Sequence, residues 1–186
     1  MILRILDFLL AAVGILLLSP LFCFALILGW FDTRSPLFRQ ERVGRNQQSF
    51  VLVKFRTMYP GTPSVASHLS DASAITPFGR FLRRTKLDEL PQIWNVLRGD
   101  MSLVGPRPCL FNQQDLIAAR ATLGVFDVRP GITGLAQIGN IDMSTPKLLA
   151  ETDAKMIKGL SVYSYFKYIA MTMFGTGQGD AVKIKK

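Results

Sequence analysis

An apolar run near the start of the chain, from Phe8 to Phe31, restricts the possible folds more than any other feature of the sequence. Its roughly 24 residues would form about 36 Å of α-helix, and the hydrocarbon core of a bilayer is roughly 30 Å thick. The stretch FCFALILGWFDTR at its end offers no good small-residue cleavage site, which argues against a secretory signal peptide. The run therefore predicts a segment that enters a membrane.

Two features bear on whether this segment crosses the bilayer. Ser19 and Pro20 lie near its middle, where proline removes an amide donor and presses its ring against the carbonyl four residues earlier. Positive residues flank both ends of the run, and such residues favour the cytoplasmic side. The sequence thus favours a re-entrant helix, broken at Ser19-Pro20, that enters one leaflet and returns; a single kinked spanning helix is the alternative. The flanking cations are Arg4 before the run and Arg34, Arg39, Arg42 and Arg45 after it.

The rest of the sequence predicts one helix-rich α+β domain at residues 33–186, after the membrane segment at 1–32. A turn around residues 44–46 joins two strand-like stretches into a short β-hairpin, whose second strand covers residues 50–57. Short helices are expected at ITPFGRFLRRT, from Glu89 to Arg98, at NQQDLIAARATLG and at TPKLLAETDAKMIK. VYSYFKYIAMTMF fits either an amphipathic helix in the membrane interface or a buried core helix.

Charge narrows the class of partner. The chain has 22 Lys and Arg against 13 Asp and Glu, a formal net charge of +9. This balance favours nucleic acid, phosphorylated small molecules or anionic membrane lipids. No nucleic acid is expected, because no recognised binding motif is present and a membrane segment is an unusual companion for one. The two cysteines, Cys23 and Cys109, suggest neither a disulfide framework nor a zinc site.

Two adjacent carboxylates, Asp88 and Glu89, stand out in the stretch TKLDELPQIWNVL. One interpretation makes Asp88 the N-cap of the helix that follows, with its carboxylate at the positive end of the helix dipole. The other is catalytic. A carboxylate among arginines stays ionised near neutral pH, as an attacking carboxylate or a magnesium ligand must. The two interpretations are compatible.

Phosphate chemistry also needs cations that neutralise phosphoryl oxygens. Candidates are Lys54 and Arg56 on the second strand, Arg107 between two prolines, and Arg129 before Pro130-Gly131. Each taken singly is more often a surface or structural residue. Most of them, however, lie in or beside Pro- and Gly-rich corners, where a rigid backbone holds a side chain in place.

Three blocks in order, after an apolar N-terminal segment, make the pattern specific: KFRTM at 54–58, LDELPQIWNVLRGDMSLVGPRP at 87–108 and RPGITGLAQI at 129–138. Together they resemble the bacterial sugar transferase family, the monotopic phosphoglycosyl transferases. The resemblance covers nearly the whole chain and is that of a minimal single-domain member, similar to the enzymes that initiate bacterial N-glycan and O-antigen assembly. DELPQ alone would be weak evidence for this family, but three such blocks in the same order are specific evidence.

This resemblance implies an enzyme of the inner membrane, with its catalytic domain on the cytoplasmic face. Such an enzyme transfers a sugar 1-phosphate from a UDP-sugar to polyprenyl (undecaprenyl) phosphate, with Mg2+, and yields polyprenyl-diphosphate-sugar and UMP. An N-acetylated sugar is expected by family analogy, in the first membrane step of O-antigen, capsule or glycoprotein glycan assembly. The expected partners are the UDP-sugar donor, the polyprenyl phosphate acceptor and membrane lipids. The sequence indicates no oligomeric state.

The resemblance also assigns roles. Asp88 is expected to attack the sugar-bearing phosphorus and to hold the phosphosugar covalently. Glu89 is expected to position the metal or to move protons, and both carboxylates are candidate Mg2+ ligands. The residues expected to bind substrate or phosphate are Lys54, Arg56, Arg107, Arg129 and Gln137.

The chain departs from the family pattern in places. Lys86 replaces a small polar residue, and IGNIDMSTP follows Gln137 where many members have Gly-Arg, which bears on the choice of sugar. Asp153 aligns loosely with an acidic family position and is expected to be a solvated helix residue, and His68 a solvated loop residue. The rival hypothesis is a non-enzymatic basic membrane protein that docks anionic lipids, for which replacing Asp88 by Asn would change nothing.

Overall fold

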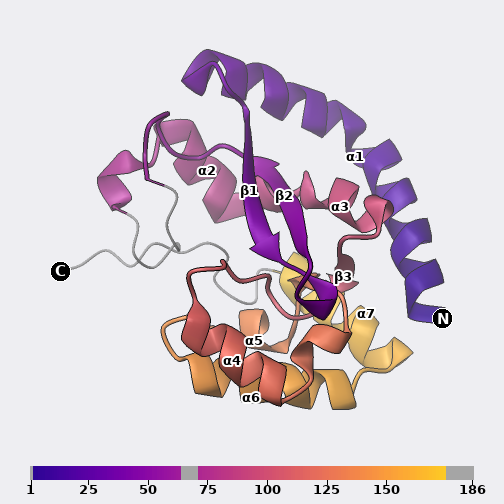
Figure 1. Cartoon of the computed structure of the whole chain (residues 1–186). Coiled ribbons are helices and arrows are strands. Elements are labelled where there is room, and N and C mark those ends of the chain that lie inside the picture. Colours follow the sequence, from indigo (N-terminus) through magenta and orange to yellow (C-terminus); the bar gives the residue numbers. More distant parts are fainter. Residues whose placement is uncertain (1, 64–70, 175–186) are drawn as a thin grey trace.

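The computed structural model describes residues 2–63 and 71–174 of the chain. A long N-terminal helix, α1 (Ile2–Thr33), arches over a central β-hairpin, and a group of shorter helices lies on the other side of the hairpin (Figure 1). Two small sheets and several helices of one to four turns make up the rest, so the predicted helix-rich α+β class is confirmed. His68 lies outside the described residues.

Helix α1 remains helical through Ser19 and Pro20, so the expected break is wrong in that respect. Pro20 has no N–H to donate to the carbonyl of Leu16, and the Ser19 hydroxyl donates to that carbonyl instead, at 2.9 Å. Figure 1 shows that α1 changes direction along its length, and an internal proline is the usual cause of a bend. Among the described residues, α1 is the one helix long and apolar enough to cross a membrane.

Both ends of α1 pack against the body of the protein. Near its start, Ala11 lies in a buried cluster with Val96 and Met101. Near its end, Ala25 packs with Phe55 and Leu82. Between these two contacts the side chains at positions 15–18 are exposed, although all are large and apolar. The middle of the helix therefore offers an apolar surface that the rest of the chain does not cover.

The predicted hairpin is confirmed. Strand β1 (Leu37–Val43) pairs antiparallel with β2 (Ser49–Phe55), and the 3-10 turn η1 (Arg45–Gln47) connects them. Side chains of a strand alternate between its two faces. The register therefore places two cross-strand pairs, Gln40 with Leu52 and Phe38 with Lys54, on one face. This face is the one that contributes to the candidate site.

The segment with the two carboxylates differs from its prediction. The expected helix α2 (Pro77–Thr85) is capped by Thr76, whose hydroxyl accepts from the amide of Gly79 at 2.8 Å. Lys86 then takes a left-handed backbone conformation and leads into a 3-10 turn, η4 (Leu87–Glu89). Helix α3 (Gln92–Arg98) begins only after Pro91, not at Glu89. A proline fits this starting position because its fixed φ suits a helix and no N–H is needed there.

A second sheet was not predicted. Strand β3 (Ser102–Val104) pairs in parallel with β4 (Gly131–Thr133), which lies in a Gly-rich segment. The backbones of Gly105 and Gly131 approach so closely that a Cβ on Gly131 would lie 2.0 Å from the nitrogen of Gly105. Only glycine permits this contact. It brings the chain after β3 against the start of β4.

The remaining elements lie mainly after β3. They are η3 (Ala72–Ala74), α4 (Gln114–Thr122), η5 (Val125–Asp127), α5 (Leu135–Ile138), α6 (Pro146–Lys158) and α7 (Val162–Met173). The predictions of α4 and α6 are confirmed. Helix α7 buries Tyr165 completely but leaves Tyr163 and Phe166 exposed, so it is not a buried core helix.

Candidate active site

A narrow cleft of about 20 Å³ lies where β1 and β2, η4 and the corner after β3 meet. Among its lining side chains, Arg42, Lys54 and Arg107 are cationic and Glu89 is anionic. The lining of the cleft is therefore electropositive, which attracts anionic groups. Its other lining residues are Leu52, Gln92, Pro108, Gly131 and Ile132.

Glu89 and Arg107 form the central polar contact of this cleft. Nη2 of Arg107 donates to Oε1 of Glu89 at 3.2 Å, and both side chains are largely enclosed. Asp88 precedes Glu89 in the same 3-10 turn and is only 2% exposed. Because α3 begins at Gln92 with Pro91 as its N-cap residue, Asp88 does not occupy the cap position of that helix. The helix-cap interpretation of Asp88 is therefore wrong.

The hairpin supplies the other two cations. Lys54 is buried on β2, with its ammonium 5.7 Å from the ring centroid of Phe38. Arg42 is buried on β1, where Nη1 donates to the carbonyl of Pro108 at 3.1 Å and Nη2 to Oε1 of Gln40 at 2.5 Å. Strand geometry thus holds two long cationic side chains on the face that borders the cleft.

Three predicted binding residues do not line this cleft. Arg56 donates through Nε to the carbonyl of Ser35 at 2.8 Å, which ties β2 to the segment after α1. Arg129 donates to the carbonyl of Gly99 at 2.7 Å. Burial, and then the nearby charges of Arg4 and Arg45, lower the pKa of Arg129.

Gln137 on α5, the third of these residues, donates to the carbonyl of Gly105 at 3.3 Å. Gly105 follows β3 directly and precedes the Pro106-Arg107-Pro108 corner. Gln137 therefore contacts the backbone that carries Arg107 and does not border the cleft itself.

Sequence reasoning did not identify Arg42 and Gln92 as site residues. The signal for Arg42 was present in the hairpin, because residues two apart on a strand share a face and Arg42 pairs with Phe50 across the turn. Counting back along both strands from Lys54 would have placed Arg42 on the same face. Gln92 belongs to the DELPQ motif, but it was assigned no role of its own.

Asp153 was expected to be a solvated helix residue, and this is wrong. Its side chain on α6 is completely buried, and Oδ2 accepts from both Nε and Nη2 of Arg120 on α4, at 3.0 and 2.7 Å. Burial raises the pKa of Asp153, and the charge of Arg120 opposes this rise. An amphipathic pattern placed the residue on the wrong face, because a charged side chain was taken to be exposed.

The carboxylates are chemically suited to a magnesium ion. Mg2+ prefers oxygen ligands and is held in many sites by one or two carboxylates together with substrate phosphates. Asp88 and Glu89 supply two such groups within one short turn. The described residues contain no group of three His, Cys, Asp or Glu that could hold a metal ion without other ligands. Any metal here would therefore need phosphate or water oxygens to complete its coordination.

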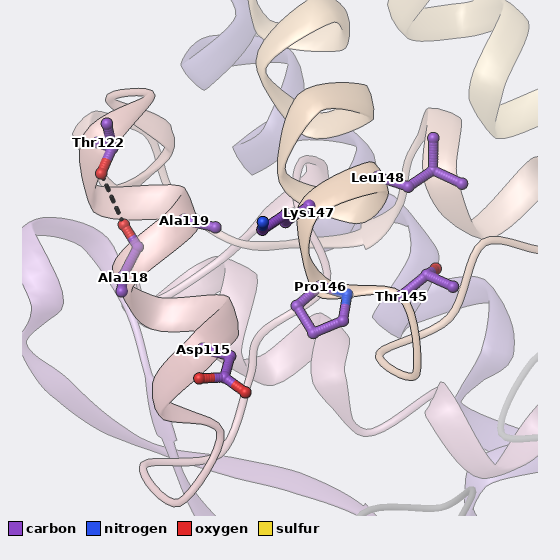
Figure 2. Close-up of a pocket in the computed structure, with 8 residues that line it drawn as sticks. All are labelled: Asp115, Ala118, Ala119, Thr122, Thr145, Pro146, Lys147 and Leu148. Atoms are coloured by element: carbon purple, nitrogen blue, oxygen red, sulfur yellow. Dashed lines mark hydrogen bonds between the residues drawn. The ribbon is translucent and has the colours of Figure 1, made fainter.

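A larger cavity, of about 680 Å³, lies between α4 and the start of α6 (Figure 2). Small and apolar side chains such as Ala118, Ala119 and Leu148 line it, together with Asp115 and Lys147. None of the residues predicted to bind substrate borders this cavity. Size alone therefore does not identify the site, because the predicted residues Lys54, Glu89 and Arg107 line the smaller cleft.

Comparison with known proteins identifies the family. The model of the family described as bacterial sugar transferase matches residues 1–178. The UDP-glucose:undecaprenyl-phosphate glucose-1-phosphate transferase of Caulobacter vibrioides is 36% identical over 177 residues, which cover 91% of this chain and 66% of that protein. The Escherichia coli protein of the same name is 36% identical over 178 residues, covering 90% of this chain and 38% of that protein. The UDP-galactose-lipid carrier transferase of Erwinia amylovora is 36% identical over 148 residues, which cover 70% of this chain and 31% of that protein. The chain thus spans less than two thirds of each of these three relatives, and it belongs to the bacterial sugar transferase family.

Proposed function

We propose that this protein transfers a sugar 1-phosphate from a UDP-sugar to polyprenyl phosphate, giving polyprenyl-diphosphate-sugar and UMP. The observation that carries the proposal is the contact of Glu89 with Arg107 in a cleft lined by two further cations, directly beside the buried Asp88. Membership of the bacterial sugar transferase family supports it, as do relatives named for UDP-sugars and undecaprenyl phosphate.

The first step is attack of an Asp88 carboxylate oxygen on the sugar-bearing phosphorus of the donor. A new O–P bond forms, the bond from that phosphorus to the bridging oxygen breaks, and UMP leaves with the bridging oxygen. Arg42, Lys54 and Arg107 neutralise charge on the phosphoryl oxygens during this step. Their positions on a hairpin and at a Pro-rich corner hold these charges in place before substrate arrives.

The second step uses the same cleft for the other substrate. A phosphate oxygen of polyprenyl phosphate attacks the phosphorus of the aspartyl phosphosugar, and the bond to Asp88 breaks. The product leaves with the phosphosugar, and the Asp88 carboxylate is restored. Both substrates are polyanions, so reaction in two steps lets their reacting phosphates approach the same cationic side chains in turn.

Magnesium is part of this proposal. A bound Mg2+ would neutralise phosphate charge and orient the donor. Asp88 and Glu89 are the residues that would hold it, with donor phosphate oxygens as further ligands. Arg107 already orients the Glu89 carboxylate. Glu89 would either position the metal or transfer protons from this orientation.

The proposed location is the cytoplasmic face of the bacterial inner membrane, with α1 as a re-entrant helix in one leaflet. Support comes from the two ends of α1, which both pack against the same body while its apolar middle is exposed. A helix that crossed the bilayer would carry one end away from that body. An anchor of this kind brings the cleft to the interface, where a lipid phosphate and a soluble nucleotide sugar can meet.

The donor is a UDP-hexose, and the family analogy favours an N-acetylated one. The relatives described above are named for glucose and galactose, so the test must include these sugars as well.

The test is UMP release by the purified protein in detergent, with undecaprenyl phosphate, Mg2+ and a panel of UDP-glucose, UDP-galactose and their N-acetylated counterparts. We expect release from one donor, and its loss in Asp88→Asn. Asp115→Asn, on the exposed side of α4, is the matched control and should retain the activity. Equal rates in both variants would remove Asp88 from the chemistry. Absence of release with every donor would favour the lipid-docking rival.

A further inference from the structure

We propose that Arg120 and Asp153 are positioning residues that fix the backbone at Arg107 and so hold its guanidinium against Glu89. The inference rests on the proposed function and extends it to two residues outside the cleft. It starts from an ion pair between α4 and α6 whose side chains are 2% and 0% exposed.

An ion pair this deeply buried contributes little to stability, because both charges lose their hydration. The pair is also incompletely satisfied, since Oδ1 of Asp153 has no hydrogen-bond partner in the part of the chain that the structure describes. Apolar residues of similar volume would fill the same space without that loss. The pair therefore needs another explanation, and the third bond of Arg120 supplies one.

Nη1 of Arg120 donates to the main-chain carbonyl of Arg107 at 2.8 Å. The guanidinium thus uses one edge for Asp153 and its remaining nitrogen for Arg107. Asp153 holds the planar guanidinium of Arg120 so that Nη1 points at the carbonyl of Arg107. Because the guanidinium is planar and rigid, fixing two of its nitrogens fixes the position of the third.

The carbonyl of Arg107 is one of four in succession that are held by distant parts of the chain. Pro106 accepts from the amide of Gly131 at 2.8 Å, and Cys109 accepts from the amide of Val43 at 3.0 Å. Between them, the carbonyl of Pro108 accepts from Arg42 at 3.1 Å and that of Arg107 from Arg120. Residues 106–109 are thereby held at every peptide.

Geometry of this kind matters because the Arg107 side chain meets Glu89 at 3.2 Å in the cleft. Pro106 and Pro108 fix their own φ, and Pro108 also favours extended torsions at Arg107, but within that range the orientation of the Arg107 peptide depends on the bond to its carbonyl. The bond to the Arg107 carbonyl comes from the side chain of Arg120 on α4. Loss of that bond would let the peptide turn and move Arg107 relative to Glu89.

The decisive variant is Arg120→Lys, which keeps a cation for Asp153 but has no planar fork to reach Arg107 at the same time. We expect kcat for UMP release to fall about tenfold or more, with KM for the donor changed by less than about threefold. Arg45→Lys is the matched control, because Arg45 also donates to a distant carbonyl, that of Asp127, at 2.9 Å. It should leave both constants unchanged.

A second variant separates positioning from folding. Arg120→Met combined with Asp153→Leu replaces the pair by apolar side chains and should fold with a melting temperature near that of the wild type. It should nevertheless lose kcat as Arg120→Lys does. A purely structural pair predicts instead that activity returns with stability, and that result would overturn the proposal.

Hydrogen exchange tests the positioning role without relying on catalytic activity. In Arg120→Lys, the peptide over residues 104–110 should exchange faster, while peptides from α4 and α6 should not. This readout needs no turnover, so an inactive wild type would contradict the proposed function without deciding the positioning role. Unchanged exchange at 104–110, or a kcat equal to that of Arg45→Lys, would overturn the inference.

Discussion

Asp7 joins α1 to the body of the protein through three hydrogen bonds and an ion pair. Its Oδ1 accepts from the Ser102 hydroxyl at 2.9 Å, the Leu103 amide at 2.8 Å and the Tyr165 hydroxyl at 2.8 Å. Arg4 lies 3.5 Å from Oδ2. Arg4 is a neighbour of Asp7 in the same helix, whereas the contacts to β3 and α7 come from residues far away in the chain.

Replacing Asp7 by Asn should destabilise the folded protein by about 2 kcal/mol, because three donors lose a charged acceptor and Arg4 loses its partner. Chemical denaturation in detergent measures this difference. Asp115→Asn, at an exposed position, should change the free energy of unfolding by less than about 0.5 kcal/mol. Equal stability of Asp7→Asn and Asp115→Asn would show that the network does not hold α1.

Cys109 should resist thiol reagents in the folded protein. Its side chain is buried, and burial raises the pKa of the thiol, although the charges of Arg120 and Arg42 oppose the rise. At about pH 8 less of it is therefore thiolate than in an unfolded chain. Iodoacetamide followed by peptide mass spectrometry should find Cys109 unmodified until denaturant is added. Rapid modification without denaturant would contradict this burial.

Single residues also show what sequence reasoning can and cannot reach. Glu89, Lys54 and Arg107 were predicted from their motifs and line one cleft. Arg42 was missed because only its strand register, and not a motif, reveals its face. Asp153 was misplaced because its burial depends on Arg120, and such a partner 33 positions away leaves no local signal.

At the level of helices and strands, local sequence signals predicted α2 and the hairpin, whereas the pairing of distant strands was not predicted. Thr76 and Pro77 predicted the start of α2, and the turn after Val43 predicted the hairpin. Strand β4 has only three residues in a Gly-rich segment, and its pairing with β3 spans almost thirty positions. No local periodicity marks such a strand, because three residues are too few to alternate.

Substitutions at Ser19 and Pro20 test whether the proline sets the bend and the membrane topology of α1. Replacing Pro20 by Leu restores an N–H for the carbonyl of Leu16, so α1 should straighten and one of its ends should lose contact with the body. Cysteine-accessibility mapping in membrane vesicles should then place the two ends of the helix on opposite sides. Ser19→Ala retains the proline and should keep the wild-type topology. Both ends of Pro20→Leu on the cytoplasmic side would show that proline does not control the topology.

At the scale of the whole molecule, the exposed apolar surface follows from how α1 is held. Its two ends dock against different buried clusters of one body, and the side chains between them face outward. Figure 1 shows the cleft-forming hairpin directly beneath this arch. A membrane that takes up the exposed middle of α1 would therefore lie close to the candidate site, as the proposed transfer to a lipid phosphate requires.

Wild-type topology should follow from this arrangement. Single cysteines at Ile2 and at Arg34, in a background without Cys23 and Cys109, should both react with a membrane-impermeant maleimide from the cytoplasmic side. Both positions are exposed at the two ends of α1 or next to it. Labelling of one position from each side of the membrane would make α1 a spanning helix and would contradict the re-entrant proposal.

Intact-protein mass spectrometry can detect the proposed intermediate, in which Asp88 carries the phosphosugar between the two substrates. Purified protein is mixed with Mg2+ and the active UDP-sugar in the absence of polyprenyl phosphate. We expect release of about one UMP per protein molecule and a mass increase of one phosphosugar, located on the peptide with Asp88 and absent from Asp88→Asn. UMP release that requires the lipid phosphate, with no covalent adduct on the protein, would contradict it.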